Sequence, residues 1–290
     1  MRLSQLRILL AVADHGSFTA AAAHTGISQP AVSRAIAALE GELAARLITR
    51  QRDGAVLTEA GRRAVVHART AVHHIDLVKS EVAATTGEVA GELRLASLPT
   101  AAGTLMAPLL REFTDRYPQV RVQLLEGFDR DVRSWLERGA IELGVVTLPA
   151  PGFTTTELGS DEMMALLPPD HPLARESVTE AVEIAALANE PFILSTGGCR
   201  PVILHAVHEA GADLTVAYEA GELSAIEAMV GQGLGISVVP TLGRKDSEAV
   251  VTRPLRPPVK RTLALAFAGS EPGSPAARAL YNLASNERMP

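Results

Sequence analysis

Residues 17–39 constrain the fold of this chain more than any other segment, because two helix-forming stretches meet there at a glycine turn. Ser17 is a good N-cap for a first, alanine-rich helix, and Gly26 supplies the backbone freedom that a sharp turn needs. Ser28 is placed to cap a second helix, with Pro30 in its first turn, where the missing N–H costs nothing. The pattern predicts a helix-turn-helix.

The predicted second helix separates apolar from polar side chains. Its apolar residues fall on one face with helical spacing: Ala31, Val32, Ala35, Ile36 and Leu39. Gln and Arg side chains suit bidentate contacts with adenine and guanine edges, and the N-terminal part of such a helix enters the major groove. Double-stranded DNA is therefore the expected partner, contacted by Ser28, Gln29, Pro30, Ser33 and Arg34. An alanine-rich helical hairpin inside a globular core is the alternative that this segment leaves open.

A small hairpin wing is predicted directly after this pair of helices. Residues 47–58 form a strand, an Asp53-Gly54 turn and a second strand. Arg50 and Arg52 stand just before the turn, where they could contact phosphate or the minor groove. Both arginines join the expected DNA contacts, against the alternative of two solvated surface side chains.

A long helix is predicted to follow, because residues 58–86 contain no Pro and only one Gly. Small and apolar residues repeat along it at alternating steps of three and four: Gly61, Ala64, Ala68, Ala71, Ile75, Val78 and Val82. This is the spacing of a coiled-coil seam, and a helix of about 28 residues is about 42 Å long. The segment 59–87 is expected to pair two copies of the chain. The alternative is a long amphipathic helix packed on its own domain.

From residue 88 onwards the pattern changes to strands that alternate with helices. Strands are expected at 92–96, 120–125 and 141–147, with helices at 103–117 and 131–138. A second set has strands at 162–167, 192–195, 215–218 and 235–239 and helices at 200–210 and 223–230, followed by a strand at 261–267 and a helix at 275–285. Such alternation indicates a largely parallel sheet, so this region is expected to form an α/β domain of two lobes with a cleft between them.

Four predicted strand-to-helix turns carry small or polar residues, at 97–100, 126–128, 195–199 and 220–224. Ligands of open α/β sheets bind beyond the carboxyl ends of the strands, where helix N-termini favour an anion such as a carboxylate. The expected effector contacts are Ser97, Pro99, Thr100, Phe128, Thr147, Ser195, Thr196, Cys199 and Glu222. Because Glu222 disfavours an anion beside it, the small molecule should also carry a hydrogen-bond donor. Ordinary helix capping is the alternative for each Ser and Thr.

The single cysteine, Cys199, cannot form a disulfide within the chain. It precedes Arg200 at the predicted start of a helix, and both a helix N-terminus and a neighbouring cation lower the pKa of a thiol. A reactive thiol at this position makes redox sensing an alternative to small-molecule binding.

The net charge of −6 is divided unevenly along the chain. Residues 1–87 contain ten Lys and Arg against seven Asp and Glu, whereas the remainder contains 17 against 26. The basic part coincides with the predicted DNA-binding module. Its mild excess indicates that base contacts and dimerisation contribute more to specificity than phosphate attraction does.

The motifs of several enzyme classes are absent from the sequence. There is no HExxH, CxxC, GxxxxGK[ST] or GxSxG pattern, so no enzyme activity, metal or cofactor is expected. No apolar run approaches the roughly 20 residues that span a membrane. The N-terminus lacks the pattern of a signal peptide, so a cytoplasmic location is expected.

Residues 1–66 resemble the winged helix-turn-helix of the LysR-type transcriptional regulators. The match rests on ordered positions at fixed spacing: Phe18-Thr19-Ala20-Ala21-Ala22, Ser28-Gln29-Pro30-Ala31-Val32-Ser33, Ile36, Leu39-Glu40, Leu43, Leu47, Arg50 and Leu57-Thr58-Glu59-Ala60-Gly61. Thr25, Ala44 and Ile48 depart from the Leu, Gly and Phe that are usual in the family, all three at packing positions.

The resemblance implies a winged helix-turn-helix at 1–58, a linker and dimerisation helix at 59–87, and an effector-binding domain at 88–290 that is similar to periplasmic solute-binding proteins. Its first lobe would comprise about 91–160 and 262–290 and its second about 161–261, with crossings near residues 159–161 and 260. The resemblance further implies a homodimer or homotetramer on an interrupted palindromic operator and a small-molecule effector in the cleft. RNA polymerase is a further candidate partner.

The stretch 192–213, together with Pro99-Thr100, is also similar to the peroxide-sensing branch of this family. In that branch a peroxidatic cysteine occupies the place of Cys199, and a second cysteine lies nine residues further on, where this chain has His208. The resemblance implies that a redox sensor built on Cys199 would stop at sulfenic acid or pair with another thiol.

Overall fold

The computed structural model describes residues 1–51, 54–85, 88–175, 181–244 and 247–286, and it divides into two compact units. The first unit comprises Met1–Gly91 with Arg138–Ala140, and the second comprises the rest of the chain. Within the described residues no helix is both long enough and apolar enough to cross a lipid bilayer.

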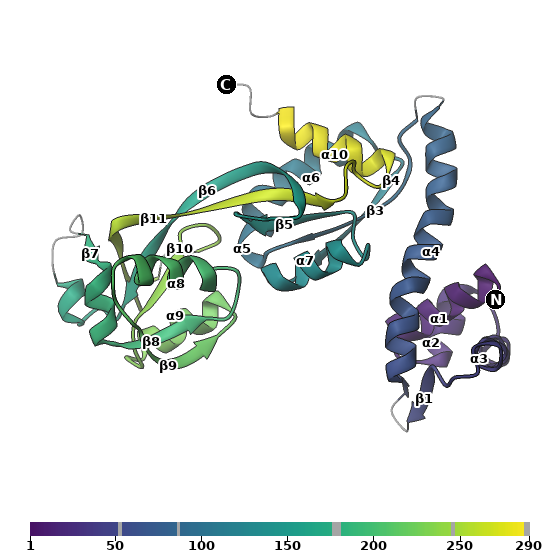
Figure 1. Cartoon of the computed structure of the whole chain (residues 1–290), viewed down its shortest axis with the longest axis horizontal. Coiled ribbons are helices and arrows are strands. Elements are labelled where there is room, and N and C mark those ends of the chain that lie inside the picture. Colours follow the sequence, from purple (N-terminus) through teal and green to yellow (C-terminus); the bar gives the residue numbers. More distant parts are fainter. Residues whose placement is uncertain (52–53, 86–87, 176–180, 245–246, 287–290) are drawn as a thin grey trace. The chain divides into compact units, whose positions relative to one another are not determined.

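The first unit is a winged helix-turn-helix followed by a long helix, which confirms the predicted architecture (Figure 1). Its elements are α1 (Leu3–His15), α2 (Phe18–Thr25), α3 (Gln29–Leu43), β1 (Ile48–Gln51), β2 (Gly54–Leu57) and α4 (Glu59–Ala84). The strands β1 and β2 are antiparallel, with Ile48 opposite Leu57. The core is built from buried side chains of the three short helices and the start of the hairpin, among them Leu9, Val12, Val32, Ile36, Leu39 and Leu47.

The two helices of the DNA-binding motif are capped differently. The Ser17 hydroxyl accepts hydrogen bonds from two N–H groups in the first turn of α2, as predicted. Ser28 occupies the N-cap position of α3, but its side chain caps no N–H group of the described chain, contrary to the prediction. Pro30 has no N–H to offer, and the N–H of Ala31 donates to the backbone oxygen of Ser28 instead. The exposed Ser28 hydroxyl is therefore available to a partner.

Helix α4 has two halves with different surroundings. In the first half, a β-carbon on Gly61 would lie only 2.0 Å from the backbone oxygen of Leu47, so the helix and the hairpin touch through backbone atoms. Ala68 is buried in the core of the unit, and Arg69 pairs with Asp14 of α1. In the second half the apolar seam residues are exposed: Ile75, Val78 and Val82. The prediction of one continuous seam is thus wrong at its start, where the helix packs against its own domain.

The second unit is built on a seven-stranded sheet in the order β10-β6-β11-β5-β3-β4, with β7 beside β11. Its strands are β3 (Gly91–Ser97), β4 (Val120–Glu126), β5 (Leu143–Thr147), β6 (Phe153–Leu167), β7 (Val182–Glu183), β10 (Ser237–Pro240) and β11 (Val251–Ala268). β3 and β5 are parallel, but β11 runs antiparallel to β5 and to β6, so the expectation of a largely parallel sheet is wrong.

The antiparallel pairing was missed because the two longest strands, β6 and β11, are longer than the sequence predicted. β6 and β11 contain 15 and 18 residues, whereas the sequence predicted only 162–167 and 261–267. Prolines discourage a strand assignment, and β11 contains Pro254, Pro257 and Pro258. The register of β11 with β6 shifts between Pro254 and Val259, and within this stretch Leu255 and Arg256 pair with β7 instead.

Two lobes are built on this sheet (Figure 1). The first lobe contains β3, β4 and β5 with α5 (Pro99–Ala101), a π-helical turn (Ala102–Met106), α6 (Ala107–Arg116), α7 (Asp129–Glu137) and α10 (Pro275–Asn286). The second lobe contains β10 and the parallel pair β8 (Pro191–Ser195) and β9 (Thr215–Ala220), with α8 (Arg200–Glu209), α9 (Leu223–Gly231) and short turns at Pro172–Ala174 and Ile184–Asn189. β6 and β11 run through both lobes, and residues 159–161 lie opposite 261–263.

Candidate ligand cavity and DNA-reading surface

A cavity of about 320 Å³ lies between the two lobes of the second unit. All four strand-to-helix turns picked out in the sequence border it. Six of the nine side chains expected to contact an effector line it: Pro99, Thr100, Phe128, Ser195, Cys199 and Glu222. The first three belong to the first lobe and the others to the second, so a molecule in the cavity would touch both lobes.

Ser97, Thr147 and Thr196 are not among the residues that line the cavity. Ser97 is fully buried, and its hydroxyl donates to the backbone oxygen of the next residue. Thr147 is buried at the end of β5, where its N–H donates to Asp129 Oδ1 at 2.6 Å. The N–H of Thr196 donates to the backbone oxygen of Ala220 at 2.9 Å. The hydrogen bonds described for these three residues are therefore made within the protein and not toward the cavity.

Arg261, which no sequence motif identifies, lines the cavity and is 2% exposed. Its Nε and Nη2 donate to the two carboxylate oxygens of Asp161, each at 2.9 Å. Its Nη1 donates to Thr100 Oγ1 at 3.3 Å and to Cys199 Sγ at 3.4 Å. Arg261 therefore connects the paired strands β6 and β11 to one side chain of each lobe. The only signal in the sequence is a charged residue directly before an apolar strand.

Cys199 occupies the N-cap position of α8 and is 7% exposed. Burial raises the pKa of its thiol; Arg261 opposes this shift and Asp161 adds to it. The prediction of a lowered pKa is therefore wrong. Arg200 forms an ion pair with Glu219 at 2.8 Å, and the loss of solvation on burial outweighs the remaining favourable charge. Burial thus favours the neutral thiol over the thiolate.

The other charged side chains at the cavity form a second ion pair and an acidic rim. Arg244 and Glu227 pair at 3.3 Å, with their side chains only 11% and 21% exposed. Glu222 is the exposed N-cap residue of α9. The walls are mainly apolar: Leu98, Phe128, Ile226, Val238 and Val239. Because both arginines already face a carboxylate, Glu222 gives the described lining a surplus of negative charge.

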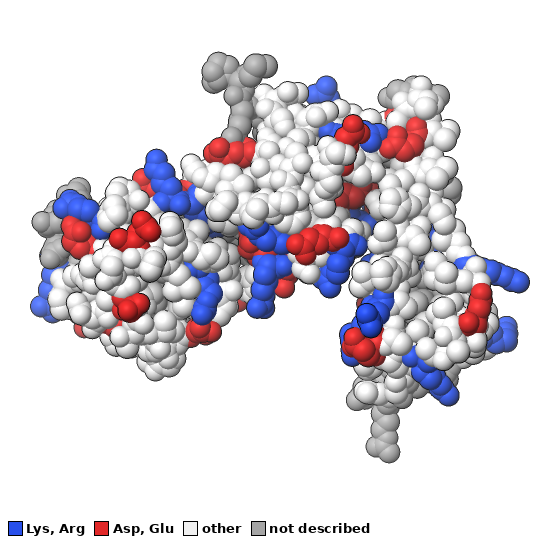
Figure 2. All heavy atoms as spheres, viewed as in Figure 1, with Lys and Arg blue, Asp and Glu red and all other residues white. Residues whose placement is uncertain are grey.

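The residues expected to read DNA lie on the first unit. At the start of α3, Ser28, Pro30 and Arg34 are exposed, whereas Gln29 and Ser33 are partly buried. Arg34 thus extends from the surface of the helix that a major groove would receive. In Figure 2 several arginine side chains project from the visible face of the first unit, whose helix-turn-helix contains no lysine.

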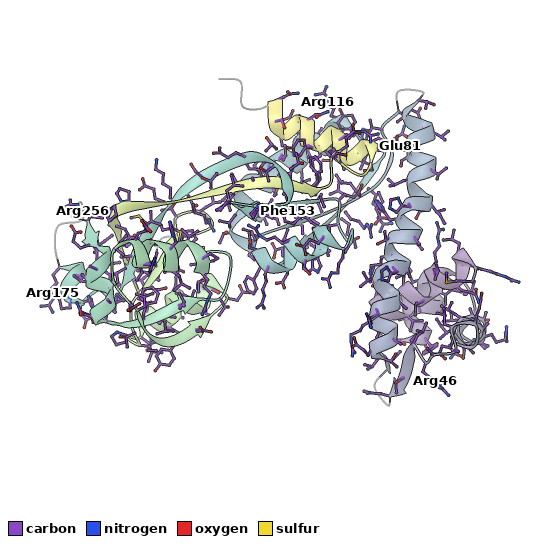
Figure 3. The ribbon with its side chains drawn as sticks, viewed as in Figure 1. Arg46, Glu81, Arg116, Phe153, Arg175 and Arg256 are labelled. Atoms are coloured by element: carbon purple, nitrogen blue, oxygen red, sulfur yellow. The ribbon has the colours of Figure 1, made fainter. Side chains whose placement is uncertain are left out.

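The basic residues expected in the hairpin are described only in part. Arg50 lies in β1, where its backbone alone is described, and Arg52 lies outside the described residues. Arg46, which was not among the expected DNA contacts, is exposed just before β1 (Figure 3). Its position between α3 and the wing could have identified Arg46 as a candidate DNA contact.

Both parts of the chain match a known family. Residues 3–62 match the bacterial regulatory helix-turn-helix protein, lysR family, and residues 86–288 match the LysR substrate binding domain. The chain belongs to the LysR family of transcriptional regulators.

This LysR-family regulator is 33% identical to the HTH-type transcriptional regulator YvbU of Bacillus subtilis over 98% of each chain. It is 30% identical to the DNA-binding transcriptional dual regulator OxyR of Escherichia coli, over 95% of this chain and 91% of OxyR. Among solved structures, full-length OxyR from Pseudomonas aeruginosa has a TM-score of 0.72 at 25% identity, covering 100% of this chain and 95% of the other. CbnR complexed with its target DNA shares the fold, with a TM-score of 0.70 at 23% identity over 99% of each chain.

Proposed function

We propose that a small molecule bound between the lobes controls this LysR-family regulator. The observation that carries the proposal is the convergence of four strand-to-helix turns, two from each lobe, on one cavity of about 320 Å³. Ligand pockets for small molecules typically measure about 300–1,000 Å³. A molecule that touches both lobes can bind two arrangements of the lobes with different affinities, and this difference is what shifts a conformational equilibrium.

The lining favours a small amphipathic molecule with a carboxylate and a hydrogen-bond donor. Helices α8 and α9 begin at the cavity, and the N–H groups at a helix start attract a carboxylate. Phe128 and Leu98 suit an apolar body. Glu222 suits an ammonium or hydroxyl group, because its own charge would repel a second anion.

In the same proposal α3 reads DNA bases and α4 pairs two copies of the chain. Arg34 contacts a base edge, and Arg46 contacts phosphate together with the wing arginines Arg50 and Arg52. The exposed stripe of Ile75, Val78 and Val82 packs against the same stripe of a second copy. Two reading helices held in this way fit an interrupted palindrome, and further pairing through the effector domains would give a tetramer.

A thermal-shift titration of the full-length protein tests the effector proposal. The probes are matched compounds with one charged group removed in turn: L-leucine, 4-methylpentanoate and 3-methylbutylamine, extended to other small carboxylates. A carboxylate is expected to raise the Tm saturably in the wild type and in Cys199→Ser, and to lose most of its effect in Phe128→Ala. A series in which no carboxylate produces a saturable rise would overturn the proposal.

A second candidate function is redox sensing through Cys199. Two observations favour it: the thiol lines the cavity and accepts a hydrogen bond from Arg261 at 3.4 Å, and the chain is 30% identical to OxyR of Escherichia coli. The raised pKa weighs against it, because the thiolate is the nucleophile that attacks peroxide. Peroxide treatment should then yield a sulfenic acid on Cys199, and DNA binding should change in the wild type but not in Cys199→Ser. DNA binding that is insensitive to this oxidation would exclude the redox function.

A further inference from the structure

Gly243 of the second lobe approaches the backbone of the first lobe more closely than any side chain would allow. A β-carbon on Gly243 would lie 2.8 Å from both Cα and the backbone oxygen of Thr100, and 3.1 Å from Cβ of Thr100. Carbon atoms in favourable contact are about 3.5–4.0 Å apart. Because the nearest atoms belong to the backbone of Thr100, a change of side-chain rotamer cannot relieve the contact.

Three further glycines of the second lobe lie close to first-lobe side chains around the start of α7. A β-carbon on Gly221 would lie 2.8 Å from Cζ of Phe128, and one on Gly197 would lie 3.3 Å from Cδ1 of the same ring. A β-carbon on Gly198 would lie 3.0 Å from Cβ of Asp129. The Phe128 ring of the first lobe is therefore seated against two glycines of the second.

This crowding does not accompany every glycine turn of the second lobe. Gly211 and Gly233 also have positive φ angles, of 65° and 73°, but a β-carbon on either would meet no atom within 4 Å. A close approach can also arise within the second lobe, because a β-carbon on Gly235 would lie 2.4 Å from the backbone oxygen of Pro191. Gly197, Gly198, Gly221 and Gly243 differ from Gly235 in that each also faces atoms of the first lobe.

We propose that Gly197, Gly198, Gly221 and Gly243 form an interlobe lock. A side chain at Gly221 or Gly243 would force the closed lobes apart, and one at Gly197 or Gly198 would crowd the same contact. Their first-lobe partners Thr100 and Phe128 also line the cavity, so releasing the lock and opening the cavity are one movement. The lock sets the balance between closed and open lobes, and thereby access to the cavity. It acts on the lobes themselves, whichever molecule the cavity takes.

Cys199 provides a natural reporter of this movement. It is the single cysteine of the chain, it follows Gly198 directly, and it is 7% exposed. Its Sγ and Thr100 Oγ1 both accept hydrogen bonds from Nη1 of Arg261. Separation of the lobes takes Thr100 away from this cluster and admits water to the thiol. The rate at which DTNB labels Cys199 in the native full-length protein therefore follows the population of open lobes.

The decisive comparison is Gly243→Ala against Gly233→Ala. The two positions have φ angles of +79° and +73°, so alanine strains the backbone alike, but only Gly243 faces another lobe. Gly243→Ala is expected to raise the labelling rate about tenfold or more over the wild type, whereas Gly233→Ala should stay within about twofold. Equal labelling rates in the two variants would overturn the lock.

Gly221→Ala keeps the proposal testable if Gly243→Ala does not fold, with circular dichroism as the measure of folding. Its control is Gly103→Ala, where the added β-carbon meets no atom within 4 Å. Faster labelling is expected in Gly221→Ala alone, and equal rates in the pair would again overturn the lock. Because no ligand enters these measurements, failure of the lock leaves the proposed effector function unaffected, and the thermal-shift titration tests that function separately.

Discussion

Arg261 and Asp161 lie opposite each other in the pairing of β11 with β6 and join their side chains through two hydrogen bonds of 2.9 Å. The two side chains are only 1% and 5% exposed. Removing one partner of such a pair leaves the other as a buried, uncompensated charge, which is far more costly than the pair itself. The strands that run through both lobes are thus held together at the cavity by an interaction that tolerates little change.

Asp161→Asn is therefore expected to lower the free energy of unfolding of the effector domain by about 3–5 kcal/mol, measured by chemical denaturation. The control is Glu183→Gln, which breaks the ion pair between Glu183 and Arg256. The side chain of Arg256 is 65% exposed and that of Glu183 is 59% exposed. That loss should stay below about 1 kcal/mol, because solvent screens an exposed pair. Similar losses in both variants would show that Arg261 is not dependent on Asp161.

Arg34→Ala is expected to weaken binding to a selected operator by about 1–3 kcal/mol and to change binding to scrambled DNA little, because a base contact carries sequence information. Arg46→Ala should weaken binding to both DNAs about equally, as a phosphate contact does. Gel-shift titrations at one fixed salt concentration measure both effects. An equal loss on the two DNAs for Arg34→Ala would remove its base-reading role.

Ala44→Gly is expected to stabilise the DNA-binding unit by about 0.5–1 kcal/mol. Ala44 follows α3 with φ 51° and ψ 32°, a left-handed conformation in which a β-carbon is strained. Ala37→Gly in the exposed interior of the same helix is the control, and it should destabilise by about 1 kcal/mol. Thermal unfolding measures the change in stability of both variants. Changes of the same sign in Ala44→Gly and Ala37→Gly would rule out strain at Ala44.

Glu142→Gln is expected to raise the Tm at about pH 8, with a gain that shrinks as the pH falls toward the usual glutamate pKa near 4.5. Glu142 is 7% exposed, and burial raises the pKa of its carboxyl above that value even though a hydrogen bond from Ser274 acts in the opposite direction. The folded state then binds the proton more tightly than the unfolded state. The stabilisation from this tighter proton binding is fully present below the pKa of Glu142 in the unfolded state. It is lost as the pH rises through the higher pKa of Glu142 in the folded state.

Thermal scans across this pH range measure the effect. The exposed Glu137 offers a control, because Glu137→Gln should show no comparable pH-dependent gain. A gain for Glu142→Gln that is constant with pH would refute the assignment of the cost to the buried charge.

If two copies pair through α4 as proposed, Val78→Asp is expected to give monomers at micromolar concentrations, because it places a charge in the exposed stripe of α4. His74→Asp adds the same charge at an exposed position of this helix outside the stripe and should leave the dimer intact. Sedimentation velocity distinguishes the two states. Dissociation of both variants would indicate a general effect of charge on the helix.

Local sequence rules predicted the helix-turn-helix, the hairpin and the turns around the cavity, because caps, glycine turns and strand ends are decided by residues close together in the chain. They missed the length of β11, whose prolines lie where its register with β6 shifts. Asp161 and Arg261 stand 100 residues apart in the sequence, so their ion pair follows only from strand register.

The pKa of Cys199 shows the same limit. Its neighbour Arg200 predicted a lowered value, but the shift depends on burial, which residues from other elements create. The seam of α4 stays a prediction in its exposed half and is wrong in its first half, since heptad spacing does not tell whether a helix packs on a partner or on its own domain.

Because α4 is divided into a packed half and an exposed half, the number of residues between the two halves matters. Ion pairs from Arg69 to Asp14 and from Arg7 to Asp76 hold α4 to α1, and the exposed stripe begins at Ile75, between these two pairs. Each residue turns an α-helix by about 100° and lengthens it by about 1.5 Å. If the stripe pairs two copies as proposed, one residue inserted between Arg69 and Ile75 would turn the stripe to another side relative to α1 and would separate Asp76 from Arg7. The length of this short stretch would then determine the direction in which α3 of each copy faces the double helix.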